Sequence, residues 1–141
     1  MLLRGFMMAG LLTLLGCAGE RPATLGIYDG KLGSCPDTPN CVSSTDEREA
    51  HHIAPLAATL AQIRQALSGM PEARIIQEDG RYLYAEFTSR LMGFVDDVEF
   101  LENPSEGHTD VRSASRLGHS DLGVNRKRIE RLREVLRGDT R

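Results

Sequence analysis

Residues 74–101 read RIIQEDGRYLYAEFTSRLMGFVDDVEFL and contain the clearest strand pattern in the chain. Its apolar residues alternate with polar ones, which is typical of strands that bury one face. Asp79-Gly80 is typical of a two-residue hairpin turn, and Gly93 marks a second turn. The stretch therefore predicts three consecutive antiparallel strands, at residues 74–78, 81–89 and 94–101.

A fourth strand and two helices complete the predicted domain. The strand is expected near residues 109–116, and a helix follows from about Val124 to Arg137. Upstream, apolar residues at helical spacing predict a helix from near Pro55 to Leu67. The order α-β-β-β-β-α, with short connections, predicts an α+β fold in which a four-stranded antiparallel sheet carries both helices on one face.

The turn positions set an expected register, which assigns each side chain to a face. The expected neighbours are Ile76 with Leu83, Phe87 with Asp96, Ala85 with Val98, Val98 with Ser113, and Glu99 with Arg112. The face toward the helices then carries Ile76, Leu83, Ala85, Phe87, Phe94, Val98, Phe100 and Val111. The outer face carries Tyr82, Tyr84, Glu86, Asp97, Glu99, Arg112 and Arg116, with Val95 and Leu101 as apolar exceptions.

Asp96 is an acid on the face predicted to be apolar, with Ser113 and Ser115 as its polar neighbours. A buried carboxylate requires partners, because its desolvation otherwise costs several kcal/mol or forces protonation. The expected partner is Arg126 or Arg128, at the start of the last helix. The interpretations left open are a structural ion pair, a one-residue bulge that turns Asp96 outward, and a functional pocket.

Glu86 and Asp97 are predicted to lie opposite each other on the outer face. Like charges in this position repel each other, so we expect Arg112 or Arg116 to bridge them. The favoured interpretation is a solvated face of salt bridges, and the alternative is a cation or ligand site.

Residues 112–126 form the densest polar stretch and lead into the last helix. A helix N-terminus can hold an anion through its free N–H groups, and several arginines lie nearby. Alternatively, Ser120, Asp121 or Asn125 only caps the helix. His119-Ser120-Asp121 is not interpreted as a catalytic triad, because triad residues converge in space and neighbours in sequence seldom do. The candidate residues for binding a ligand or partner are Asp96, Arg112, Ser115, Arg116, Ser120, Asp121, Asn125 and Arg126.

The N-terminus has the layout of an export signal. Arg4 precedes an apolar stretch around Phe6 to Leu15 that is too short to span a bilayer but fits a signal peptide. Leu14-Leu15-Gly16-Cys17 resembles the lipobox of bacterial lipoproteins, which implies cleavage before Cys17 and a lipid on that residue. The alternatives are a plain secretory signal and a short anchor helix. The expected division is a signal peptide at 1–16, a tether at 17–28 and a single domain at 29–141.

The chain has three cysteines, so Cys35 and Cys41 remain if Cys17 carries lipid. An even remainder in an exported chain favours a disulfide, which would clip the loop between them. A metal site that adds His51 and His52 is disfavoured by the cysteine spacing and by the opposite directions of adjacent side chains. A redox-active pair is disfavoured because no Cys-x-x-Cys is present. We expect no metal and no cofactor.

The formal net charge of −3 argues against a nucleic-acid partner, since such partners require a basic footprint. No motif in the sequence is specific for a catalytic site, and no catalytic residue is assigned.

Several motifs resemble those of the domain-of-unknown-function family 1499. They lie at residues 35–44, 82–87, 93–100, 112–118 and 120–126. The resemblance covers nearly all of the chain after the tether. It implies a small, often envelope-associated bacterial domain, and it implies no established activity, substrate or cofactor. The family's recurring stretches match Asp96, Asp97, Arg112, Ser115, Arg116, Asp121 and Asn125.

These features predict a lipid-anchored protein of the bacterial cell envelope that acts as a binding or scaffold module. Its expected partners are the membrane, through the lipid on Cys17, and an anionic envelope component or an envelope protein. In a Gram-negative cell the protein would face the periplasm, and Ala18, in place of the Asp that signals inner-membrane retention, favours the outer membrane. The alternatives are an envelope enzyme that uses Asp96 or Asp97 with an arginine clamp, and a purely structural lipoprotein.

Overall fold

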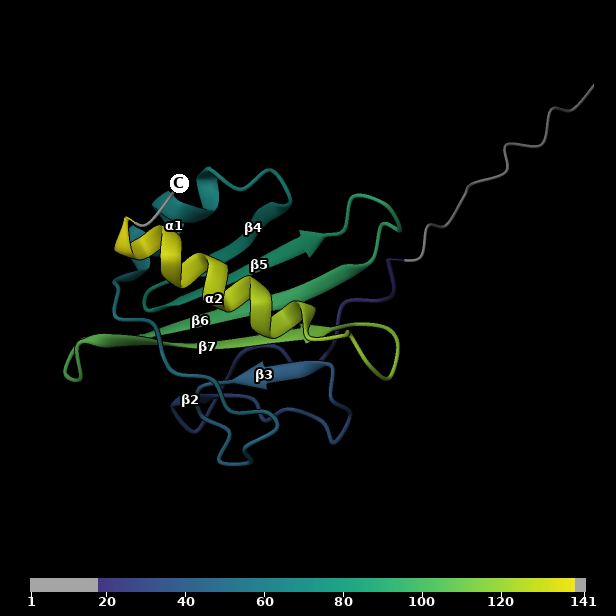
Figure 1. Ribbon diagram of the computed structural model, residues 1–141. Helices are drawn as coiled ribbons and strands as arrows, with labels where there is room; N and C mark the ends of the chain where they lie inside the picture. Colours follow the sequence, from purple (N-terminus) through teal and green to yellow (C-terminus); the bar gives the residue numbers. More distant parts are fainter. Residues whose placement is uncertain (1–17, 139–141) are drawn as a thin grey trace, which may run out of the picture.

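The computed structural model describes residues 18–138, so the predicted signal peptide and the lipidation of Cys17 lie outside the described residues. Its centre is a five-stranded antiparallel sheet in the order β3-β7-β6-β5-β4, and β1 and β2 form a separate two-stranded sheet (Figure 1). The elements are β1 (Ile27–Tyr28), β2 (Lys31–Leu32), β3 (Cys41–Ser43), α1 (Leu60–Ser68), β4 (Ala73–Asp79), β5 (Tyr82–Thr88), β6 (Val95–Asn103), β7 (His108–Ser115) and α2 (Val124–Arg137).

The two helices lie over the same face of the sheet, as predicted (Figure 1). α2 spans the predicted residues, and its apolar residues Ile129 and Leu132 are fully buried. They belong to one apolar core with Ile63 of α1 and with Val98 and Phe100 of the sheet. Helical periodicity alone predicts this contact, because it gathers the apolar side chains on one helix face.

α1 begins at Leu60, later than the predicted start near Pro55. Thr59 and Gln62 form a capping box: the Thr59 hydroxyl accepts from the Gln62 amide at 3.3 Å, and the Gln62 side chain accepts from the Thr59 amide at 2.9 Å. Leu56, which helical spacing assigns to this helix, instead forms a backbone bridge with Thr109. Leu56 is fully buried, so it still contributes to the core, but from an extended segment.

The sheet contains one strand more than the predicted four. β3 pairs antiparallel with β7, which places Cys41 opposite Ala114 and Ser43 opposite Arg112. β3 has only three residues, which is too few to show the alternation of apolar and polar side chains by which a strand is predicted. The pairing satisfies backbone groups that β7 would otherwise expose as an edge strand.

The predicted register is confirmed between β5, β6 and β7. Each of these strands is long and is joined to the next by a loop of few residues, which leaves little freedom in the pairing. The confirmed pairs are Phe87 with Asp96, Ala85 with Val98, Val98 with Ser113, and Glu99 with Arg112.

The predicted register between β4 and β5 is wrong, because Asp79 pairs with Tyr82 and the turn residues are therefore Gly80 and Arg81. Glu78, rather than Ile76, lies opposite Leu83. A bulge between Ile75 and Gln77 then changes which side chain faces the helices. The result is that Ile75 packs on the core beneath the helices and Ile76 packs on the outer face.

The predicted register also places Phe94 on the helix-covered face, which is wrong. β6 begins one residue later, at Val95, and Phe94 lies in the preceding loop with 40% of its surface exposed. Its side chain is therefore not part of the core.

The outer face is buried, which corrects the prediction of a solvated face. Asp97 and Glu99 are only 1% and 0% exposed. Residues 18–35, hereafter the N-terminal cover, contact this face, and Leu32 of β2 packs with Tyr82 and Leu101. The described part of the predicted tether, residues 18–28, belongs to this cover. Within residues 18–138, no helix has the length and apolar character needed to cross a membrane.

Candidate functional site

The eight candidate binding residues do not form one site, because the sheet separates them. Arg112 and Arg116 lie on the outer face, beneath or beside the N-terminal cover. Asp96 and Ser115 lie on the opposite face, where they approach α2. The loop before α2 and the first turn of α2 carry Ser120, Asp121, Asn125 and Arg126.

Glu99 is a fully buried acid on the outer face with three donors around it. Its carboxylate accepts from the Tyr82 hydroxyl at 2.8 Å, from the Gly26 amide at 2.7 Å and from Arg112 Nη1 at 3.2 Å. Burial, and then the charge of Glu99, raise the pKa of Tyr82, so this tyrosine stays protonated and donates. The Arg112 Nε atom is buried without a hydrogen-bond partner among the described residues. The hydrogen bond from the Gly26 amide to Glu99 attaches the N-terminal cover to β6.

Arg116 bridges the facing acids Glu86 and Asp97, as predicted. Its Nε and Nη2 atoms donate to Asp97 at 2.9 and 2.7 Å, and Nη2 also donates to Glu86 at 2.6 Å. The Tyr84 hydroxyl donates to both acids. Arg21, from the N-terminal cover, donates to Glu86 at 2.6 Å and lies 5.6 Å from the centre of the Tyr84 ring.

This network fixes the protonation states of its members. Hydrogen bonds to Asp97 raise the pKa of Arg116. Burial acts to raise the pKa of Glu86, but hydrogen bonds from Arg21, Arg116 and Tyr84 outweigh it and lower that pKa to about 2. Two acids and two guanidinium groups therefore compensate each other, which favours the salt-bridge interpretation over a cation site.

Asn125 connects α2 to the sheet from a fully buried position. Its Oδ1 atom accepts from the Ser113 hydroxyl at 2.6 Å. Its Nδ2 atom donates to the Ser115 hydroxyl at 2.8 Å, to the Asn40 carbonyl at 3.1 Å and to Asp121 at 2.8 Å. One amide side chain thus fixes the start of α2 against β7 and against the residue that precedes β3.

The N-cap residue of α2 is Gly123, which has no side chain, and Asp121, two residues earlier, accepts from the first amides in its place. This favours the capping interpretation of the polar stretch. The two carboxylate oxygens of Asp121 accept from the backbone amides of Gly123 at 2.9 Å and Asn125 at 2.8 Å. Burial favours the neutral acid, but the hydrogen bonds from Asn125 and Gly123 prevail and lower the pKa of Asp121. Ser120 is exposed, and Arg126 donates to the Ala50 carbonyl at 3.3 Å.

Asp96 forms an ion pair with Arg128, one of its two predicted partners. Arg128 also donates to the Ser113 hydroxyl at 3.1 Å and to Asn125 at 2.8 Å. Its guanidinium carbon lies 4.9 Å from the centre of the Phe87 ring. Asp96 is 8% exposed and points toward α2, so no bulge turns it outward.

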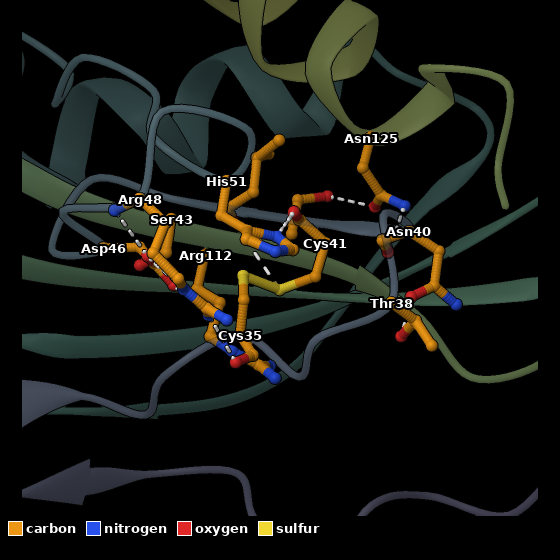
Figure 2. The surroundings of a disulfide bond; sticks show 12 residues. Cys35, Thr38, Asn40, Cys41, Ser43, Asp46, Arg48, His51, Arg112 and Asn125 are labelled. Carbon is orange, nitrogen blue, oxygen red and sulfur yellow. Dashed lines mark hydrogen bonds and ion pairs between the residues drawn. A yellow bond between two sulfur atoms is a disulfide. The ribbon is translucent and has the colours of Figure 1, made fainter. Parts of the chain in front are cut away.

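The predicted disulfide joins Cys35 to Cys41. Figure 2 shows it enclosed by side chains from the neighbouring loop and from the sheet. Arg48 donates to the Cys35 carbonyl at 2.8 Å and pairs with Asp46 at 2.7 Å. His51 Nδ1 lies 3.0 Å from the Cys41 carbonyl oxygen. The bond links the end of the N-terminal cover to the start of β3.

The alternative of a metal site formed by the two cysteines with His51 and His52 does not fit the observed contacts. The cysteines are bonded to each other, and His52 Nδ1 lies 2.9 Å from the carbonyl oxygen of Asp46. Within the described part of the chain, no group of His, Cys, Asp and Glu side chains is placed to hold a metal ion.

An open pocket of about 580 Å³ lies between α2, the α1–β4 loop and the end of β5. Met70, Phe87 and Val124 give it an apolar part. Arg90 and Lys127 also line it, and neither forms an ion pair with another described residue. An anion that carries an apolar group would suit this lining. The remaining lining residues are Pro71, Glu72, Thr88, Ser89, Arg128 and Arg131.

The sequence contains part of the signal for this pocket. Val124, Lys127 and Arg131 are spaced three and four residues apart, which places them on one helix face. Met70 and Arg90 come from separate loops, and only the tertiary structure brings them to this helix face.

The comparison with protein-family models matches residues 31–136 to a family described as "Protein of unknown function (DUF1499)". The comparison with curated proteins found no match, and the comparison with solved structures found none. The family description assigns no activity.

Proposed function

The chain belongs to the DUF1499 family of proteins of unknown function, and from this premise we propose that it is a lipid-anchored envelope protein that binds an anionic, partly apolar envelope component. The pocket beside α2 carries this proposal. Arg90 and Lys127 supply positive charge that is not compensated by an ion pair among the described residues, and Met70 and Phe87 supply apolar surface.

The candidate acid Asp96 supports this pocket indirectly. It holds Arg128 through an ion pair, and Arg128 lines the pocket beside Phe87. A guanidinium group fixed in this way is preorganised, so a ligand would not have to order it on binding. The enzyme alternative is weaker, because Asp96 and Asp97 are each engaged by an arginine.

The anchor and the location rest on sequence patterns. Leu14-Leu15-Gly16-Cys17 supports a lipid on Cys17, and a disulfide supports an oxidising compartment outside the cytoplasm. In a Gram-negative cell we propose the outer membrane, with the domain in the periplasm.

The pocket is tested with dihexanoyl-phosphatidylglycerol, a soluble anionic amphiphile, added to the full-length protein purified from membranes. Isothermal titration calorimetry should show binding, and dihexanoyl-phosphatidylcholine should bind more weakly. Arg90→Ala with Lys127→Ala should weaken binding of the anionic probe roughly 30-fold, if each cation contributes about 1 kcal/mol.

Arg81→Ala is the matched control, because Arg81 is an exposed arginine in the β4–β5 turn, away from the pocket lining. It should leave the affinity unchanged. Equal affinity of the anionic and zwitterionic probes, or equal loss in the control, would contradict the pocket assignment.

The anchor is tested separately by Cys17→Ser. This variant should be released from the membrane fraction or remain uncleaved. Normal processing and normal membrane attachment would show that Cys17 carries no anchoring lipid.

A further inference from the structure

Within residues 18–138, one end of the domain carries most of the large exposed apolar side chains. Of the eight large apolar residues that are exposed in the described chain, six lie in the β5–β6 loop or between β7 and the start of α2. Leu91 is 96% exposed and Leu122 is 86% exposed. Exposed apolar groups that gather in this way mark an interaction surface. The six residues are Leu91, Met92, Phe94, Leu117, Leu122 and Val124.

The two loops lie side by side. The Arg116 amide donates to the Val95 carbonyl at 3.4 Å, at the point where one loop ends and the other begins. Figure 1 shows both loops leaving the sheet at the same end, opposite the β6–β7 turn. Residues 89–94 and 117–124 are therefore one surface, which we call the apolar end.

The backbone of Leu122 is strained. Its φ angle is 53°, in the left-handed region that a bulky L-residue rarely adopts. The Ser120 hydroxyl accepts from the Leu122 amide at 3.3 Å, and Asp121 accepts from the Gly123 amide, which holds this loop shape. The Leu122 side chain is largely in solvent. Packing within the described chain therefore does not compensate for the backbone strain.

The charge beside the apolar end is basic. Arg90 and Lys127 are exposed, and Arg126 is partly exposed. Of the nearby acids, Asp121 is engaged at the start of α2, and Glu20 is exposed. Apolar side chains bordered by cations suit the interface of an anionic bilayer, where the apolar groups enter the headgroup region and the cations meet lipid phosphates.

The N-terminal cover begins at this same end. A methyl group built on Gly19 would lie 3.1 Å from Leu117 Cγ, so Gly19 contacts the apolar end directly. Cys17 is two residues earlier, and successive Cα atoms are about 3.8 Å apart. Ala18 and Gly19, the first described residues, lie at this end, so a lipid on Cys17 would be attached one residue before the point where the described chain meets the apolar end. Because the proposed lipid attachment point and the apolar end are close together, we infer that a bilayer, rather than a soluble partner, covers this surface.

We propose that the apolar end contacts the bilayer, with residues 89–94 and 117–124 entering the interface of an anionic membrane. The proposal rests on the proposed lipid anchor on Cys17 and adds a fixed orientation to it. Arg90 and Val124 belong both to the apolar end and to the pocket lining, and Lys127 lines the pocket next to them, so the pocket opens at the membrane surface. An acidic lipid would reach it without crossing water.

Tryptophan fluorescence tests this orientation, because the chain contains no tryptophan of its own. Leu91→Trp and Leu122→Trp each place one reporter at an exposed position of the apolar end, and Ser105→Trp places one in the exposed β6–β7 turn at the opposite end. The full-length protein is purified from membranes and reconstituted into vesicles of phosphatidylethanolamine and phosphatidylglycerol. Its mass shows whether Cys17 is acylated.

The emission of Leu91→Trp and Leu122→Trp should shift to the blue on reconstitution, and brominated lipid should quench most of it. Ser105→Trp should show neither change. Adding Arg90→Glu and Lys127→Glu to Leu91→Trp should reduce the quenching in phosphatidylglycerol vesicles. An acylated protein whose three reporters respond equally would overturn the orientation and leave the anchor intact. A mass without the acyl group would overturn the anchor and the orientation that depends on it.

Discussion

The face of the sheet beneath α1 and α2 is closed mainly by aliphatic and aromatic packing, whereas the opposite face is closed by acids, arginines and tyrosines beneath the N-terminal cover. On the first face, Phe100, Leu83 and Val98 are fully buried. On the second, Glu99 and Asp97 are buried almost as completely, and each has an arginine partner.

This difference shows that burial and apolar character are separate properties of a sheet face. Apolar packing tolerates small shifts, because it does not depend on direction. A buried ion pair stabilises only in good geometry, since desolvation otherwise exceeds the attraction. The N-terminal cover packs Leu25 and Leu32 on this face, and directional contacts from Gly26 and Arg21 to its acids add to that packing.

The strongest test of this comparison is Asp97→Ala. It removes a buried carboxylate that Arg116 contacts through two nitrogens, and Arg116 keeps Glu86 as an ion-pair partner. Removing one member of a buried pair costs about 3–5 kcal/mol of unfolding free energy, and because Glu86 remains, urea unfolding should show a loss near the lower end of that range. This reverses the expectation of a small effect that follows from placing Asp97 on a solvated face.

Glu78→Ala is the control for that measurement. Glu78 pairs with Arg64 at 3.0 Å, and both side chains are substantially exposed, so the loss should stay below about 1 kcal/mol. Similar losses in the two variants would show that the outer face is not closed by its ion pairs.

The second test uses pH. The folded pKa of Glu86 is lowered from 4.5 to about 2, so its charged form stabilises the protein fully above pH 4.5 and this stabilisation is lost as the pH falls toward 2. One pKa unit corresponds to about 1.4 kcal/mol, which gives a change of about 3 kcal/mol. The difference in unfolding free energy between the wild type and Glu86→Gln should shrink by that amount on acidification. Parallel pH curves for the two proteins would contradict it.

The third test is Asp96→Ala, on the face beneath the helices. Arg128 loses its ion pair but keeps Ser113, Asn125 and the Phe87 ring as partners. The expected loss in urea unfolding is about 2 kcal/mol, typical of a hydrogen bond to a charged group. It should therefore be smaller than the loss in Asp97→Ala, and the opposite ranking would show that the pair beneath α2 is the better buried of the two.

The smallest effect concerns the covalent link between the N-terminal cover and the sheet. Replacing both Cys35 and Cys41 with Ser opens a short loop, for which chain entropy predicts a loss of about 2 kcal/mol at most. Mass spectrometry of unreduced, alkylated wild type should first show no free thiol at either residue. Two alkylated thiols in protein taken directly from the envelope would contradict the disulfide.

Local pattern was sufficient for much of the fold and for part of the polar network. Alternation and short turns predicted the pairing of β5, β6 and β7, and this pairing led directly to the bridge from Arg116 to Glu86 and Asp97. The unexpected acid Asp96 pointed to its partner at the start of α2. In each case, the residues belong to elements with strong periodicity or to their ends.

Pattern failed where a distant segment determines the environment. Three residues of β3 carry no alternation, and their pairing partner in β7 lies some 70 positions away in the chain. Asp97 sits on a strand face whose polar composition indicates solvent, yet the N-terminal cover buries it. Nothing local in the Gly26 backbone indicates that its amide donates to Glu99.

Local sequence patterns were enough to predict the order of the helices and central strands, the pairing of β5, β6 and β7 and the cysteine pair, because periodicity and turn chemistry act between near neighbours in the chain. Contacts between distant segments determine that the polar face is buried, that the polar candidates are divided by the sheet, and that Arg90 and Lys127 line one pocket. These outcomes depend on which distant segments come into contact, and that is fixed by the balance of desolvation and pairing across the whole molecule.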